Sequence, residues 1–114
     1  MSTEYYQIQK ENNYGNQFIS TKSFSSIAIH VMKDKKGIDF EGGSLDMIPG
    51  TKGPLSVKIN DNNQIIILMD VVIDYGINVN KIVEELQTAI LNEISAMIDI
   101  RNVKINVNVK NINF

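Results

Sequence analysis

Apolar residues recur at two different spacings along this chain, and each spacing predicts a different kind of element. Spacings of three and four residues predict a helix over about residues 21–33, capped by Ser20 or Thr21. Its apolar stripe consists of Phe24, Ile27, Ala28 and Val31. A longer stripe of the same kind predicts a second helix over residues 79–98, with Asn78 as its N-cap. The chain therefore has two amphipathic helices that need a common apolar surface to cover.

A spacing of two residues predicts strands in other parts of the chain. Residues 55–59 alternate between apolar and polar, and one parity of residues 64–74 is wholly apolar. The Asp and Asn residues at 61–63 predict a tight turn that joins these two strands as an antiparallel hairpin. Residues 103–110 show the most regular alternation and predict a final strand, while Phe18 and Ile19 predict a short extended segment before the first helix.

These elements follow one another in the order strand, helix, hairpin, long helix, strand. A βαββαβ chain of this size predicts an α+β two-layer sandwich, with both helices on one face of a small, mostly antiparallel sheet. The opposite face of the sheet would then be polar, through Ser56, Lys58, Asp70, Asp74, Lys104, Asn106 and Asn108. Residues 1–16 show no periodicity, so we expect a flexible N-terminal tail, followed by a single α+β domain over residues 17–114.

Composition narrows the classes of function that this fold could serve. The length of 114 residues fits one small domain, and the net charge of −2 argues against nucleic-acid binding, which usually needs a basic surface. The absence of cysteine excludes disulfides, thiolate metal sites and a cysteine nucleophile. The longest apolar run, Ile65–Met69, is much shorter than the roughly 20 residues that span a membrane. We therefore expect a cytoplasmic protein that does not insert into the membrane by itself.

No combination of side chains predicts catalysis or cofactor binding. His30 is the only histidine, and no Ser, Cys or Asp motif accompanies it. Asp70 and Asp74 would lie roughly 13 Å apart along one strand, which is too far for a paired-carboxylate site. We expect no catalytic, metal-binding or cofactor-binding residue and no small-molecule substrate. The alternative function is a small RNA-binding module, because the segment Gly50–Gly53 matches the GxxG loop of KH-type modules.

One segment carries a resemblance to a known family. A hydrophobic strand ends in Asp74, Tyr75 and Gly76, after which Asn78 caps a helix that carries Gln87, and an alternating final strand follows. In this order, residues 18–112 resemble the alkaline shock protein family, the envelope stress response proteins of Gram-positive bacteria. Ile (19), Asn (14) and Lys (10) have A/T-rich codons, and their excess fits a low-GC bacterium of that group.

The resemblance implies a non-enzymatic interaction or scaffold protein of the cell envelope. By the same resemblance, we expect the chain to self-associate as a homo-oligomer and to be held at the inner face of the cell membrane by a membrane-anchored partner protein. The matching residues would have structural roles, in a turn and in the second helix; they are Asp74, Tyr75, Gly76, Asn78 and Gln87.

The final strand gives an independent argument for self-association. Its apolar positions are Val103, Ile105, Val107 and Val109, without proline. If this strand lies at the edge of the sheet, its unpaired backbone groups could template a strand from a second subunit. The alternative is that Lys104 and Lys110 protect the edge.

Overall fold

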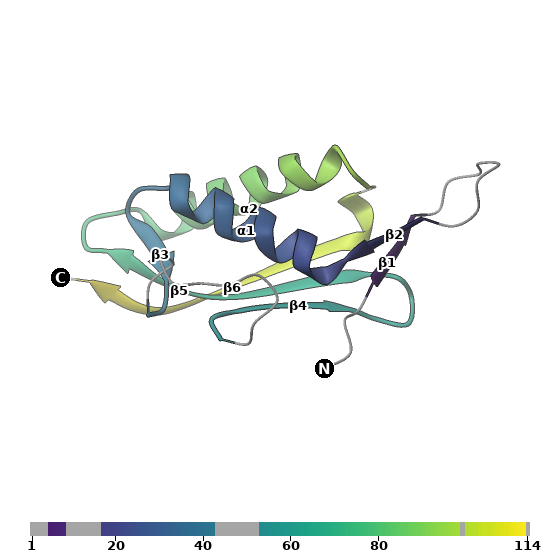
Figure 1. The fold of residues 1–114 in the computed structure, drawn as a ribbon. Coiled ribbons are helices and arrows are strands. Elements are labelled where there is room, and N and C mark those ends of the chain that lie inside the picture. Colours follow the sequence, from purple (N-terminus) through teal and green to yellow (C-terminus); the bar gives the residue numbers. More distant parts are fainter. Residues whose placement is uncertain (1–4, 9–16, 43–52, 99, 114) are drawn as a thin grey trace.

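A computed structural model describes residues 5–8, 17–42, 53–98 and 100–113. In chain order, its elements are β1 (Tyr5–Ile8), β2 (Gln17–Ser20), α1 (Thr21–Asp34), β3 (Ile38–Phe40), β4 (Leu55–Ile59), β5 (Ile65–Asp74), α2 (Val79–Ser95), a 3-10 turn (Ile100–Asn102) and β6 (Val103–Asn113). Both helices cover the same face of a four-stranded sheet (Figure 1). This confirms the predicted α+β two-layer sandwich.

Strand β5 is the centre of the main sheet. Along one side it pairs antiparallel with β4 and, further on, with β3, so that these two short strands share one edge. Along the other side it pairs in parallel with β6, from Ile65↔Val103 to Asp74↔Asn113, with a bulge that leaves Lys110 unpaired. Among the described strands, β6 pairs only with β5, and it is therefore the other edge.

The predicted hairpin is present, and its turn shows why these residues were needed. The Asn60 side-chain oxygen accepts hydrogen bonds from the backbone N–H groups of Asn62 (3.0 Å) and Gln64 (2.9 Å). Asn63 has a φ of 58°, a left-handed conformation that Asn adopts more readily than most residues. The side chains thus fix the turn and the register of β4 on β5.

Both predicted helix caps are confirmed. The Ser20 hydroxyl oxygen accepts from the N–H of Lys22, and the Asn78 side-chain oxygen accepts from the N–H of Lys81, each at 3.1 Å. The second helix ends at Ser95, three residues before the predicted end. The helical hydrogen-bond pattern tightens there, because the N–H of Met97 bonds the carbonyl of Ile94.

The order of strands differs from the expectation in two places. Strand β2, which corresponds to the predicted segment at Phe18 and Ile19, pairs with β1 in a separate two-stranded sheet, and β3 supplies the additional strand of the main sheet. The three residues of β3 are too few to show a period in the sequence. Strand β1 lies within the segment 1–16 that we expected to be a flexible tail, and the rest of that segment is outside the described residues.

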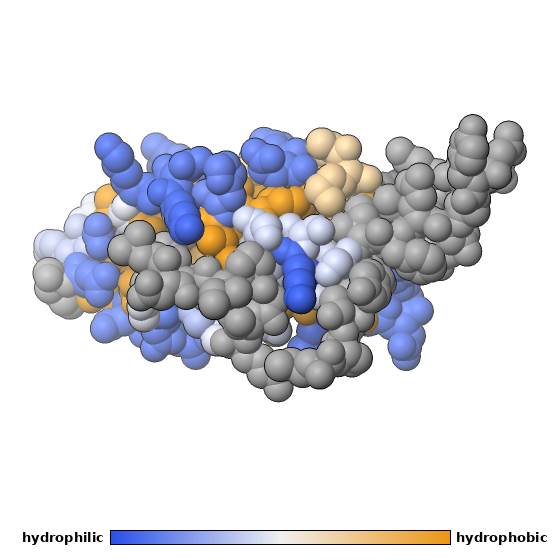
Figure 2. All heavy atoms as spheres, in the orientation of Figure 1, coloured by the Kyte–Doolittle hydropathy of each residue, from blue (hydrophilic) through white to orange (hydrophobic). Residues whose placement is uncertain are grey.

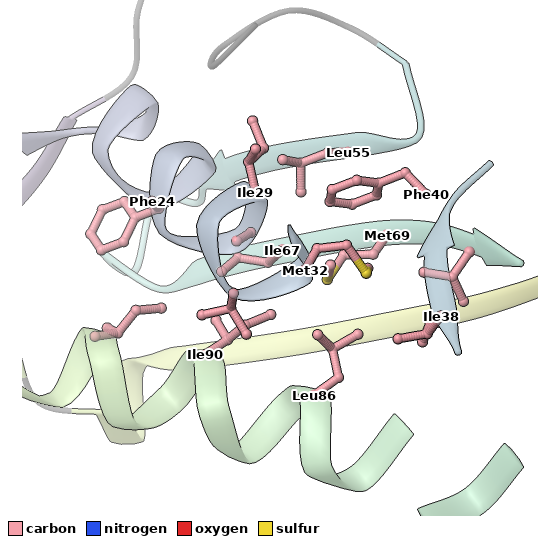
Figure 3. Close-up of a cluster of buried hydrophobic side chains, with 14 of the residues drawn as sticks. Phe24, Ile29, Met32, Ile38, Phe40, Leu55, Ile67, Met69, Leu86 and Ile90 are labelled. Atoms are coloured by element: carbon pink, nitrogen blue, oxygen red, sulfur yellow. The ribbon is translucent and has the colours of Figure 1, made fainter. Parts of the chain in front are cut away.

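The core lies between the helices and one face of β5. Figure 3 shows Phe24, Ile29 and Met32 of α1 and Leu86 and Ile90 of α2 around the strand. The residues of β5 on this face are completely buried: Ile65, Ile67, Met69, Val71 and Ile73. Burying side chains of this size stabilises the fold by about 1.5–3 kcal/mol each, so β5 is the strand on which the two layers depend most.

Candidate interaction surface

The residues Asp74–Asn78, which carry the family resemblance, form the turn by which the chain leaves the sheet after β5. The N–H of Asp74 donates to the carbonyl of Gly37 (2.9 Å), and the N–H of Tyr75 donates to the carbonyl of Asn113 (2.7 Å). Gly76 has a φ of 87°, a conformation that costs a residue with a side chain about 1–2 kcal/mol. The turn thus connects the end of β5 to the start of β3 and the end of β6, and Asn78 then starts α2. Each of these residues has its own backbone role, so their spacing along the chain is fixed.

The side chains of this turn lie on the surface of the molecule. Tyr75 is 72% exposed and Ile77 is 40% exposed. Ile77 also closes over Gly37, where an added Cβ would come within 3.1 Å of its side chain. The turn is therefore well anchored by its backbone, while it presents an aromatic and an aliphatic side chain to solvent.

Gln87 links the second helix to the edge strand. Its Nε2 donates to the carbonyl of Ile105 at 3.1 Å, across 18 residues of sequence. The structure thus brings the side chain of Gln87, a residue of α2, against β6 and away from the turn Asp74–Asn78. Its hydrogen bond to the strand was not predicted, because only the tertiary structure brings this helix face over β6.

The backbone groups of β6 alternate between two directions, and the hydrogen bonds of β5 show which residues of β6 have theirs directed outward. The N–H of Asp70 donates to the carbonyl of Pro54 (2.7 Å), and the carbonyl of Asp70 accepts from the N–H of Glu41 (2.9 Å). Both backbone groups of Asp70 are therefore directed toward β3 and β4. Backbone groups alternate in direction along a strand, so the N–H and C=O groups of Met69 and Val71, on either side of Asp70, are directed toward β6. In the parallel register, the residues of β6 whose N–H and C=O groups face away from β5 are Val103, Ile105, Val107 and Val109.

These four residues are the ones predicted for self-association, and their side chains lie on the helix side of the sheet. Val103, Ile105 and Val107 are half-buried, and Val109 is 38% exposed. The structure thus places all four on an edge strand, which was the condition for the self-association argument. Pairing with a second subunit remains a prediction.

Side chains cap this edge at two points. Gln87 donates a hydrogen bond to the carbonyl of Ile105, and the Asn111 side-chain oxygen accepts one from the N–H of Ile112 at 2.9 Å. Between these caps, no hydrogen bond from any described residue reaches the outward groups of Val107 and Val109. We call the segment Val107–Val109 the open window of β6.

The face of the sheet away from the helices is polar along β6, where Lys104, Asn106 and Asn108 lie, whereas β5 also places the half-buried Ile66, Leu68 and Val72 there, so the face is less polar than expected. Asn108 lies opposite Asp70, and its Nδ2 donates to the Asp70 carboxylate at 3.2 Å. Lys58 and Lys104 are exposed on either side of Ile66. Asp70 therefore takes part in a cross-strand pair with an amide rather than with a second carboxylate.

The charged side chains on the helices do not converge on a reactive centre. His30 Nε2 lies 3.7 Å from Asp34, and both side chains are more than 70% exposed. A solvent-open depression of about 480 Å³ is lined by Lys35, Lys81, Glu84, Glu85, Thr88, Ala89 and Asn92. Figure 2 shows hydrophilic side chains along the helix layer, with apolar surface between them. Within the described ranges, His, Cys, Asp and Glu form no group of three or more that could hold a metal ion.

Two other expectations concern loops and membranes. Gly50, Thr51 and Lys52 lie outside the described residues, so the KH-like loop stays a prediction. In the part of the chain that the structure describes, no helix is both long enough and apolar enough to cross a membrane.

The fold and its surface define a class: a small two-layer α+β protein with an exposed strand edge and an anchored turn that exposes Tyr75 and Ile77. The chain belongs to the alkaline shock protein 23 family, which has a cell envelope-related function, because the family model matches residues 9–114. This confirms the family resemblance. No curated protein and no solved structure matches the chain.

Proposed function

We propose that this protein is a non-enzymatic, cytoplasmic scaffold of the envelope stress response. It self-associates, and a membrane-anchored partner protein recruits it to the inner face of the cell membrane. Its membership of a family with a cell envelope-related function supports the setting. The partner is a protein and not the lipid itself.

The edge of β6 is the observation that carries this proposal. A strand of 11 residues with outward backbone groups is a template for another strand, and such edges must be blocked or used. Here the caps from Gln87 and Asn111 block only part of it. An edge with free backbone groups over a short segment only can pair with a strand of a second subunit at that segment and not along its whole length.

The residues of the family motif support a role in contact. Asp74, Tyr75 and Gly76 hold the exit from the sheet, Asn78 caps the helix, and Gln87 binds the edge strand. Each acts on the backbone of this chain. The motif therefore preserves the shape of a surface that includes the exposed side chains of Tyr75 and Ile77.

Light scattering tests self-association, and sedimentation with vesicles tests recruitment. We expect the mass in solution to rise with protein concentration. We also expect the protein to sediment with membrane vesicles from host cells, but not with vesicles whose surface proteins were digested or with vesicles of pure lipid. A constant monomer mass would refute self-association. Equal binding to pure lipid, or no binding to any vesicle, would refute recruitment by a protein partner.

A further inference from the structure

The open window of β6 is self-complementary, and this specifies how two copies would meet. We infer that β6 pairs antiparallel with β6 of a second copy, about a two-fold axis at Asn108. The inference rests on the proposed self-association and names its surface and register. A continuous sheet then runs through both subunits, with the helices of both on the same side.

The two caps define which backbone groups are available. The carbonyl of Ile105 already accepts from Gln87, and the N–H of Ile112 already donates to Asn111. The bulge at Lys110 ends the regular alternation of the strand. Val107 and Val109 remain, each with one outward N–H and one outward C=O.

Only one two-fold register uses the outward groups of both Val107 and Val109 and no others. In an antiparallel pair, residues whose backbone groups face each other exchange two hydrogen bonds. With the axis at Asn108, Val107 faces Val109 of the partner subunit, and Val109 faces Val107 of the partner subunit. The two pairs give four backbone hydrogen bonds.

The neighbouring registers conflict with the cap at Ile105. An axis at Val107 pairs Val109 with Ile105 of the partner subunit, and an axis at Asn106 pairs Ile105 with Val107 of the partner subunit. Both need the carbonyl of Ile105, which Gln87 holds at 3.1 Å. The Gln87 side chain therefore selects the register at Asn108.

The side chains are compatible with this register. Lys104 lies opposite Ile112 of the partner subunit, and Lys110 lies near Asn106 of the partner subunit, so no two lysines face each other directly. On the helix side, Val109 is 38% exposed and comes to lie beside Val107 of the partner subunit. The alternative that these lysines protect the edge therefore does not apply to this arrangement.

A single introduced cysteine tests the register, because the chain contains no cysteine of its own. Asn108 is exposed and would face its own copy as a non-hydrogen-bonded pair, with Cα atoms about 4.5 Å apart, which a disulfide can bridge. Asn108→Cys should therefore form a covalent dimer under mild oxidation. Asn106→Cys is the matched control on the same strand face, because its two copies would lie roughly 13 Å apart along the strands.

We expect Asn108→Cys to cross-link roughly tenfold faster than Asn106→Cys, or more, since the control exceeds the distance that a disulfide spans. Melting curves of both variants under reducing conditions check that the fold is kept. Equal rates, or faster cross-linking of Asn106→Cys, would overturn the register. If neither variant cross-links while light scattering still shows association, the surface is wrong but the proposed function stands.

A second measurement on the unmodified protein does not depend on these variants. Amide hydrogen exchange of Val107 and Val109 should slow as the protein concentration rises, since their N–H groups become bonded. Val103 also faces outward but lies outside the window, and its exchange rate should not change. Association without added protection at Val107 and Val109 would reject β6 pairing.

Discussion

Strands β5 and β6 lie side by side and are both apolar on the face that turns toward the helices, but they differ in burial. Ile67 of β5 and Ile105 of β6 are direct partners in the parallel register and point to the same face. Ile67 is completely buried, whereas Ile105 is only half-buried. The apolar pattern thus shows which face of a strand turns toward the helices, but not how deeply the strand lies in the sheet.

The difference arises from what surrounds each strand. Strand β5 has hydrogen-bonded neighbours on both sides and helices above it, whereas β6 has a described neighbour on one side only. The same kinds of residue therefore stabilise the core in β5 and form an accessible edge in β6. Stability and association are carried by two adjacent strands, and mutations should separate them.

The largest expected effect comes from shortening the matched isoleucines. Ile67→Ala should lower the free energy of unfolding by about 2–5 kcal/mol, because it leaves a cavity in a closed core. Ile105→Ala should cost about half as much or less, since the half-buried site can be reached by water. Chemical denaturation measures both values. Equal losses would mean that the edge of β6 is buried in solution, for instance by a second subunit.

Regular spacing explains which parts of the fold could be predicted from the sequence. The helices, the β4–β5 hairpin and the N-caps at Ser20 and Asn78 depend on nearby residues, so their patterns are visible. Strand β3 could not be predicted, because three residues show no period. The β6 edge could only be stated as a condition, since burial depends on neighbours that are distant in sequence.

The same limit applies to the candidate surface. Gln87 belonged to the recognised motif, but its partner Ile105 lies 18 residues away on another element. The cap from Asn111 is local, but it matters only because Ile112 is on an edge. Gln87 and Asn111 can therefore be read from the sequence, whereas the open window between their hydrogen bonds could be found only once the strand order showed that β6 is an edge.

Proline substitutions test the direction of the backbone groups in β6. The N–H of Asn108 faces β5, so Asn108→Pro removes a hydrogen bond of the sheet and should cost about 1–3 kcal/mol. The N–H of Val109 faces outward, and Val109→Pro should cost less while it abolishes association. Denaturation curves and light scattering on both variants check this. A greater loss of stability in Val109→Pro would reverse the assignment of inward and outward groups.

Removing the cap at Ile105 should have a smaller effect on stability and a visible effect on register. Gln87→Leu loses one partly buried hydrogen bond, which corresponds to about 0.5–1.5 kcal/mol. The freed carbonyl then permits registers centred on Asn106 or Val107. In the Gln87→Leu background, cross-linking of Asn106→Cys should therefore rise. An unchanged rate would show that Gln87 does not select the register.

The smallest effect is expected on the face of the sheet away from the helices, where an amide of β6 pairs with a carboxylate of β5. The Asn108–Asp70 hydrogen bond is exposed, and Asn108→Ala should change the free energy of unfolding by about 0.5 kcal/mol or less. Asn106→Ala is the matched control, because no described side chain forms a hydrogen bond with Asn106. A double-mutant cycle with Asp70→Ala isolates the pair itself. A coupling well above 1 kcal/mol would mean that this face also holds β6 in place, so that the contrast between the strands would no longer lie on the helix side alone.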